Sequence, residues 1–158
     1  MALLRVEGLQ VGFAGHAQPV LAGVDFAIQP GETVALVGES GSGKSMTALA
    51  IMQLLPKGAS MLSGRIRFEG QDVPAMPPRR LNRLRGGEIA MLFQQPVSML
   101  DPTATVGSQV AEAVRLHTGL SGKAAWNRAV GLLREVGIPA PEARARSYAH
   151  QFSGGMAQ

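Results

Sequence analysis

The chain has 158 residues, 46% of them hydrophobic, so it can bury a core and is not disordered by composition. It has no cysteine, which excludes a disulfide scaffold, a thiolate metal site and a cysteine nucleophile. The 15 basic and 11 acidic residues leave a formal charge of +4, and no apolar run approaches the ~20 residues that span a bilayer. The N-terminus does not read as a secretory leader, so we expect a soluble, cytoplasmic globular protein.

The first part of the sequence mixes strand and helix patterns. Apolar and polar residues alternate over residues 3–13, and further strands are predicted over residues 24–28, 33–37, 64–70 and 89–93. A helix is predicted over residues 46–55, ended by Pro56 and Gly58. This mixture indicates an α/β fold.

The pattern becomes helical after Pro96. Residues 106–116 carry apolar side chains at helical spacing. A second helix is predicted from a cap at Ser121 to Val136, with Gly137 as its C-terminal stop. The apolar side of that helix is predicted to include Ala125, Ala129, Leu132, Leu133 and Val136.

Six of the 12 arginines lie between Arg65 and Arg85, and four of them are nearly contiguous: Arg79, Arg80, Arg83 and Arg85. Such a run is typical either of a patch that binds phosphates or a membrane surface, or of the solvated face of a short helix. No aromatic residue interleaves with it to stack on bases. The solvated face is therefore favoured, and no nucleic-acid partner is expected.

One segment has the full Gly-x-x-x-x-Gly-Lys-Ser pattern of a phosphate-binding loop, between a predicted strand and a predicted helix. Its residues are Gly38, Glu39, Ser40, Gly41, Ser42, Gly43, Lys44 and Ser45. Glycines let the backbone approach phosphate oxygens, and the amides of the loop and of the helix N-terminus attract anions. Lys44 suits the β- and γ-phosphates, and the Ser45 hydroxyl suits Mg²⁺. The sequence lacks the Asn-Lys-x-Asp motif that reads guanine, which disfavours a GTPase.

Three further segments resemble motifs of the ATP-binding cassette (ABC) family. His150 to Met156 reads His-Gln-Phe-Ser-Gly-Gly-Met, which is similar to the signature motif of that family. Residues 89–94, Ile-Ala-Met-Leu-Phe-Gln, resemble the strand that enters the Q-loop, with Gln94 as its glutamine. Phe13 stands 25 residues before Gly38, where the family has the aromatic residue that stacks on adenine. The order of these motifs matches the family along the entire chain.

Several short stretches of the sequence resemble the corresponding stretches in the ATPases of peptide importers. Those ATPases power the uptake of dipeptides and oligopeptides, and their relatives carry nickel or glutathione. The resembling features are Phe93-Gln94-x-Pro96, Leu100-Asp101-Pro102, Met156 in the signature and the stretch 137–139. Gln95 stands where the subfamily usually has Asp, and Ala157 where it usually has Arg. Both departures lie beside the motifs and bear on the substrate more than on the chemistry.

The resemblance implies a P-loop NTPase core with an incomplete parallel sheet, an antiparallel β subdomain and an inserted helical subdomain. Residues 1–96 would form the nucleotide-binding core with the β subdomain and the phosphate loop. Residues 97–152 would form the helical subdomain, and residues 153–158 the signature motif and the end of the chain.

The same resemblance assigns roles. Phe13 would stack on adenine, residues 38–45 would hold the phosphates of ATP, and Ser45 and Gln94 would approach the Mg²⁺. Lys44 and Gln94 would serve catalysis. Ser153, Gly154 and Gly155 would contact ATP held by a second ATP-binding subunit, in a homodimer or a heterodimer. Further partners would be transmembrane permease subunits and, indirectly, a substrate-binding protein, with this subunit peripheral on the cytoplasmic face of the membrane.

The family places an Asp–Glu pair after an apolar strand beyond the signature, and a switch histidine farther on. None of the three aspartates ends an apolar strand in the matching place, and His16, His117 and His150 are expected at the surface. We therefore expect negligible ATP hydrolysis and poor stability for these residues alone. Two alternatives stay open: a nonhydrolytic ATP-binding or regulatory module, and a soluble ABC protein that acts on ribosomes or DNA.

Overall fold

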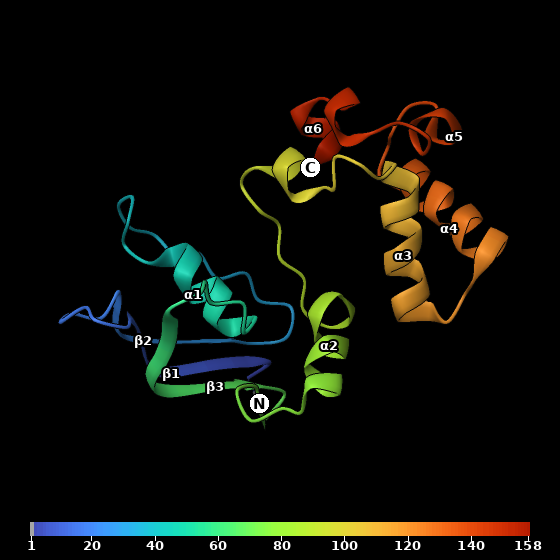
Figure 1. Ribbon diagram of the computed structural model, residues 1–158. Helices are drawn as coiled ribbons and strands as arrows, with labels where there is room; N and C mark the ends of the chain where they lie inside the picture. The colour runs from blue at the N-terminus through green and yellow to red at the C-terminus, as the bar shows by residue number, and fades with distance from the viewer. Residues whose placement is uncertain (1) are drawn as a thin grey trace. The chain divides into compact units, whose positions relative to one another are not determined.

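The computed structural model describes residues 2–158 as two compact units. The first unit ends at Ile89 and contains the β-sheet, and the second begins at Ala90 and is helical (Figure 1).

The sheet of the first unit is antiparallel throughout, with strand order β2-β1-β3-β4. The strands are β1 (Leu4–Phe13), β2 (Leu21–Ile28), β3 (Ala59–Phe68) and β4 (Gln71–Asp72). The strands predicted over residues 3–13, 24–28 and 64–70 are thus confirmed, with β2 and β3 beginning earlier than predicted. Alternation places Leu4, Val6, Ile66 and Phe68 on the buried face, whereas Arg5 lies exposed on the other face.

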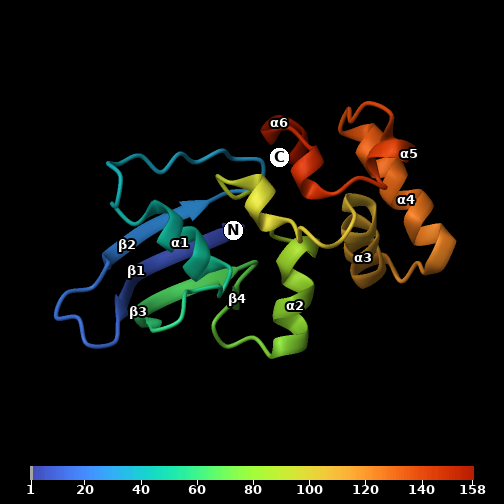
Figure 2. The same ribbon diagram turned by 45° about the horizontal axis from the view of Figure 1, so that its top comes forward.

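Helix α1 (Lys44–Ile51) lies across the buried face of this sheet, and α2 (Pro78–Gly87) lies near its edge (Figure 2). Ala50 and Ile51 of α1 and Leu84 of α2 join the sheet residues in one apolar cluster. Leu84 and Ile66 are fully buried. This apolar core holds α1, the helix that begins in the phosphate loop, against the sheet.

Two predicted strands are wrong. Residues 33–37 pair with no other strand, and the side chain of Val37 is 93% exposed. Of residues 89–93, only Ile89 makes a single bridge, with Arg85, and Leu92 is 78% exposed. An apolar run becomes a strand only when the backbone of a neighbouring strand completes its hydrogen bonds, and residues 2–158 supply no such neighbour here.

Helix α1 is also shorter than the predicted helix over residues 46–55. It ends at Ile51, and Gln53 adopts a positive φ of 52°. The Gln53 side chain donates to the Ala50 carbonyl, 2.7 Å away, which covers one carbonyl at the helix end. The helix therefore stops well before Pro56.

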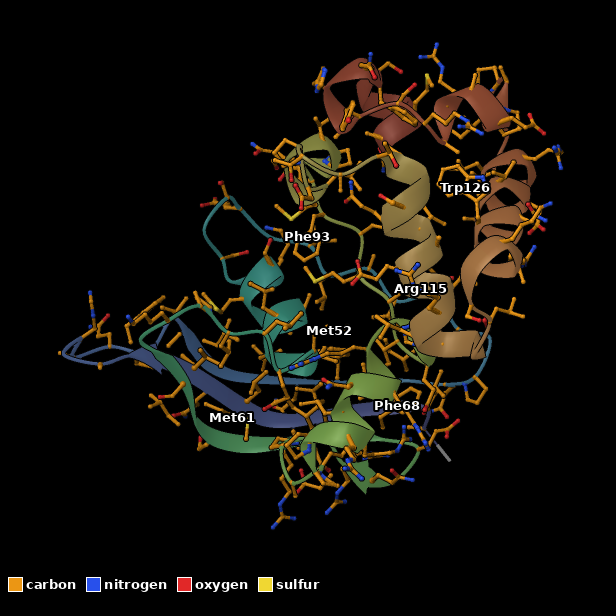
Figure 3. The ribbon with its side chains drawn as sticks, turned by 45° about the vertical axis from the view of Figure 1, so that its right-hand side comes forward. Met52, Met61, Phe68, Phe93, Arg115 and Trp126 are labelled. Carbon is orange, nitrogen blue, oxygen red and sulfur yellow. The ribbon has the colours of Figure 1, made fainter. Side chains whose placement is uncertain are left out.

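The second unit contains α3 (Val106–Thr118), α4 (Gly122–Glu135), α5 (Pro141–Arg144) and α6 (Gly154–Ala157). Two 3₁₀ turns, η1 (Pro96–Met99) and η2 (Ala149–Gln151), complete it. Helices α3 and α4 lie side by side, and Trp126 of α4 packs on the apolar cluster around Val106 (Figure 3).

Both long helices predicted from periodicity are confirmed, within two residues at each end. The apolar side of α4 differs from the prediction at one position, because Val136 lies beyond the helix and is 74% exposed. Val130, which was not predicted to lie on the apolar side of α4, is buried. Among the helices of residues 2–158, none has both the length and the apolar character needed to cross a bilayer.

Candidate functional site

The phosphate loop runs into α1, and its Lys44 is the first residue of that helix. Gly43 occupies the N-cap position with φ 89° and ψ 4°, a left-handed conformation that glycine adopts without strain. A Cβ atom at Gly43 would lie 2.3 Å from Cδ2 of Leu21, which is buried in β2. Glycine is thus required here twice, by the backbone angle and by close packing on the sheet.

The ammonium group of Lys44 lies inside its own loop. Its Nζ atom donates to the carbonyls of Gly38 and Glu39, both at 2.7 Å, and to the Ser42 hydroxyl at 3.1 Å. The loop therefore surrounds the Lys44 ammonium group. The carbonyls of Gly38 and Glu39 set the position of this ammonium group. A phosphate group entering the loop would meet a positive charge already held at the loop's centre.

The backbone amides at this helix start are available to a ligand. Within residues 2–158, the N–H groups of Gly43, Lys44 and Ser45 donate to no protein acceptor. Thr47 is buried, and both its amide and its hydroxyl donate to the Gly43 carbonyl, at 2.8 and 3.0 Å. The first turn is thus anchored while its free amides and the exposed Ser45 hydroxyl remain accessible. This donor set fits the phosphates of a nucleotide, and the hydroxyl fits Mg²⁺.

Phe13 lies at the end of β1 and is half-buried. Two residues earlier, Val11 pairs with Leu21, the residue against which Gly43 packs. The sheet therefore carries Phe13 and the phosphate loop on connected elements of one unit. The ring of Phe13 also contacts the ring of His16, with centroids 5.9 Å apart, a neighbour that motif reasoning missed.

Gln94 belongs to the second unit, in an exposed segment just before η1. Its neighbour Phe93 lines a cavity of about 160 Å³ together with Met99 of η1 and Ala157 at the end of α6. The flank of the predicted Q-loop and the end of the predicted signature segment therefore meet within this unit.

The signature residues form the start of α6. Ser153 is its N-cap, and its Oγ accepts from the Met156 amide at 3.4 Å. Gly154 and Gly155 are exposed, and a Cβ atom on either would meet no neighbouring atom. The segment thus presents bare backbone and a hydroxyl to solvent.

The three histidines are exposed, as the sequence predicts. His150, directly before the signature, stacks on Tyr148 with ring centroids 5.9 Å apart and an interplanar angle of 7°. The Tyr148 amide also donates to Oε1 of Gln151 at 2.9 Å, and the Gln151 amide donates to the Tyr148 carbonyl at 3.0 Å. The Tyr148–His150 pair was not predicted, because a spacing of two residues does not by itself indicate that two side chains meet.

Two of the three aspartates accept hydrogen bonds from other residues. Asp25 accepts from the Gly8 amide at 2.7 Å. Asp101 accepts from the amide and the hydroxyl of Thr103, and these hydrogen bonds hold the pKa of Asp101 below its ordinary value. Residues 2–158 contain no cluster of three or more histidine, aspartate or glutamate residues that could hold a metal ion.

The arginine run divides into two classes. Arg79 and Arg83 are exposed and form no ion pair within residues 2–158. Arg80 forms a forked pair with Glu88, at 2.5 and 2.8 Å, and Arg85 donates to backbone carbonyls at the end of α1. The prediction of one solvated face holds for the first two residues only, because Glu88 engages Arg80 and carbonyls more than 30 positions away engage Arg85.

Comparison with known proteins identifies the relatives of this chain. A family model described as ABC transporter matches residues 21–158. The oligopeptide transport ATP-binding protein OppD of Bacillus subtilis is 46% identical, over 99% of this chain and 44% of its own length. The dipeptide transport ATP-binding protein DppD of Escherichia coli is 42% identical, over 100% of this chain and 49% of its own length. The chain thus spans about half the length of these curated relatives.

Solved structures show the same fold. A dimeric bacterial ABC transporter cassette superposes with a TM-score of 0.79 at 23% identity, covering 98% of this chain and 65% of the other. A cassette in a post-hydrolysis state, bound to ADP and phosphate, gives a TM-score of 0.77 at the same identity and coverage. At this identity the likeness concerns the fold, which is that of the α/β P-loop NTPases.

Proposed function

Because the chain belongs to the ABC transporter family, we propose that it is an ATP-binding subunit of an importer that couples ATP hydrolysis to peptide uptake. The observation that carries the proposal is the loop Gly38–Ser45 at the start of α1, with its central cation and free amides. The names of the relatives support peptides as the transported class.

The loop residues would bind the phosphates of ATP. The Lys44 ammonium exchanges carbonyl partners for phosphate oxygens, and the amides of Gly43 and Ser45 donate to the same group. Mg²⁺, when bound at the Ser45 hydroxyl, neutralises charge on the phosphates. The left-handed backbone at Gly43 holds these donors in place before the ligand arrives, which reduces the entropy lost on binding.

The remaining site residues would act around the nucleotide. Phe13 offers a ring for stacking on adenine, and Gln94 would approach the Mg²⁺ and the attacking water. Ser153, Gly154 and Gly155 would contact ATP bound to a second subunit, which their exposure at the start of α6 permits. Permease subunits and a substrate-binding protein complete the proposed assembly, which would place this subunit on the cytoplasmic face of the membrane.

We further propose that residues 1–158 by themselves hydrolyse ATP negligibly. Phosphoryl transfer depends on charge stabilisation and on a group that positions water. Asp25 lies within β2 and accepts from the Gly8 amide of β1, and Asp101 accepts from the amide and hydroxyl of Thr103. Neither lies in a strand-end position that matches the family's acidic pair.

The test is the equilibrium binding of ATP, measured by calorimetry with Mg²⁺ present. Lys44→Ala should weaken ATP binding at least roughly tenfold, because it removes a charge-assisted contact to phosphate. Lys123→Ala, which removes an exposed cation from α4, is the matched control and should bind like the wild type. Ser153→Ala should spare binding to the monomer. Unchanged affinity in Lys44→Ala would overturn the assignment of the loop.

A further inference from the structure

Arg85 makes a contact that none of the family motifs accounts for. Its Nε atom donates to the Met52 carbonyl at 2.8 Å, and one terminal nitrogen donates to the Gln53 carbonyl at 2.5 Å. Met52 is the C-cap residue of α1, at the end of that helix in Figure 3. A guanidinium group therefore covers the C-terminal end of the helix whose first residue is Lys44.

The backbone around Arg85 directs this contact. Arg85 has φ −68° and ψ 120°, and Gly86 has φ 78° and ψ −21°, the angles of a type II turn in which glycine takes the positive φ. The Arg80–Glu88 pair spans this turn, and the amide of Ile89 donates to the Leu84 carbonyl at 2.9 Å. Leu84, the residue at which this turn begins, is fully buried, so the core holds the first residue of the turn in place.

A cation suits this end of the helix. The last carbonyls of an α-helix lack partners within it and carry the negative end of the helix dipole. Gln53 adopts a left-handed conformation that non-glycine residues rarely take, and Arg85 bonds the carbonyl of this residue. The fork of Arg85 thus stabilises the conformation in which α1 ends at Ile51.

The two ends of α1 are consequently held by different contacts. At the start, Gly43 packs on Leu21 and Thr47 bonds the Gly43 carbonyl. At the end, the strongest polar contact from another element comes from Arg85, 33 residues away from Met52 in sequence. Since the helix has only eight residues, a shift at its end displaces the loop at its start.

We propose that Arg85 is a positioning residue for nucleotide binding, which holds α1 in the orientation that makes the phosphate loop competent. This proposal rests on the proposed function. Without Arg85, α1 samples other orientations, and the apparent Kd rises as the competent fraction falls. The hydrogen-bond partners of the Arg85 side chain, Met52 and Gln53, lie outside the phosphate loop.

The experiment compares Kd for ATP, with Mg²⁺, among the wild type, Arg85→Ala, Arg85→Lys and Arg83→Ala. Arg85→Ala should bind roughly tenfold more weakly, since charge-assisted hydrogen bonds are lost. Arg85→Lys should recover part of the affinity, because an ammonium keeps the charge but not the fork. Arg83→Ala removes an exposed arginine of the same helix and should leave Kd unchanged.

Two readouts separate positioning from general stability. Millimolar guanidinium chloride should lower the Kd of Arg85→Ala toward the wild-type value, with sodium chloride at equal ionic strength as the control. Val73→Ala, a core change in the same unit, should lower the melting temperature without an equal change in Kd. Hydrogen exchange at the amides of Gln53 and Leu54, which bond Ala50 and Leu49, should accelerate in Arg85→Ala.

The proposal is overturned if folded Arg85→Ala binds ATP like the wild type. It is also overturned if Val73→Ala weakens binding as much as Arg85→Ala does and guanidinium has no effect. If instead Lys44→Ala binds ATP with the affinity of the wild type, the proposed function itself is overturned, whatever Arg85→Ala does. These results are distinguishable within one series of titrations.

Discussion

Replacing Gly43 by alanine tests the close fit between the phosphate loop and the sheet. The residue has φ 89°, and an added Cβ atom would lie 2.3 Å from Cδ2 of Leu21 and 3.5 Å from the Val20 carbonyl oxygen. Leu21 is 2% exposed, so its side chain has little room to turn away. Gly43→Ala therefore meets both a backbone and a packing penalty.

The expected loss of stability is the sum of these two penalties. A left-handed conformation costs a residue with a Cβ atom about 1–2 kcal/mol relative to glycine. Forcing a methyl group into a packed core costs about 1–3 kcal/mol more. Gly43→Ala should thus lower the free energy of unfolding by about 2–5 kcal/mol, a large part of the stability of an ordinary domain.

The measurement is urea denaturation followed by circular dichroism, with Gly31→Ala as the matched control. Gly31 has φ 77°, and a Cβ atom there would meet no other atom within 4 Å, so only the backbone penalty of about 1–2 kcal/mol applies. If Gly43→Ala and Gly31→Ala lost equal stability, the packing of Gly43 on Leu21 would play no part and the reasoning would be refuted.

Two further predictions concern hydrogen bonds outside the loop. The hydrogen bond from Arg80 lowers the pKa of Glu88 below its ordinary value of 4.5, so this pair stabilises the fold above about pH 4.5 and loses that effect as the pH falls through the folded-state pKa. Glu88→Gln should therefore melt at a lower temperature than the wild type at neutral pH, and the two melting temperatures should converge on acidification; a constant gap would contradict this. Gln109 of α3 accepts from the Asp101 amide at 2.9 Å and donates to the Asp101 and Ala104 carbonyls. Gln109→Ala should lower the free energy of unfolding by about 1–3 kcal/mol and speed hydrogen exchange at Asp101, whereas Glu112→Ala, an exposed change in the same helix, should do neither.

Local sequence predicted the elements whose stabilising pattern lies within a few residues. Alternation identified β1, and the spacing of apolar residues identified α3 and α4, because these periods follow from backbone geometry. The pattern of the phosphate loop was recognisable for the same reason, since its glycines and Lys44 lie close together in sequence. The roles of Phe13, Gln94 and Ser153 remain predictions.

Features that depend on distant partners were not predictable in this way. Residues 33–37 have the composition of a strand, but strand formation requires hydrogen bonds from another segment. The end of α1 at Ile51 likewise differs from the predicted end, and there Arg85 bonds the carbonyls of Met52 and Gln53. A helix end stabilised by a residue more than 30 positions away leaves no local signal.

The sequence by itself identified the pattern of a phosphate loop followed by a helix, and motifs in the order that resembles the ABC family. The tertiary structure decided which distant residues meet this loop and its helix: Leu21 packs against Gly43, and Arg85 bonds carbonyls at the far end of α1. Motifs can be read from sequence because phosphate binding uses adjacent residues. Their support cannot, because packing and capping join residues that only the folded chain brings together.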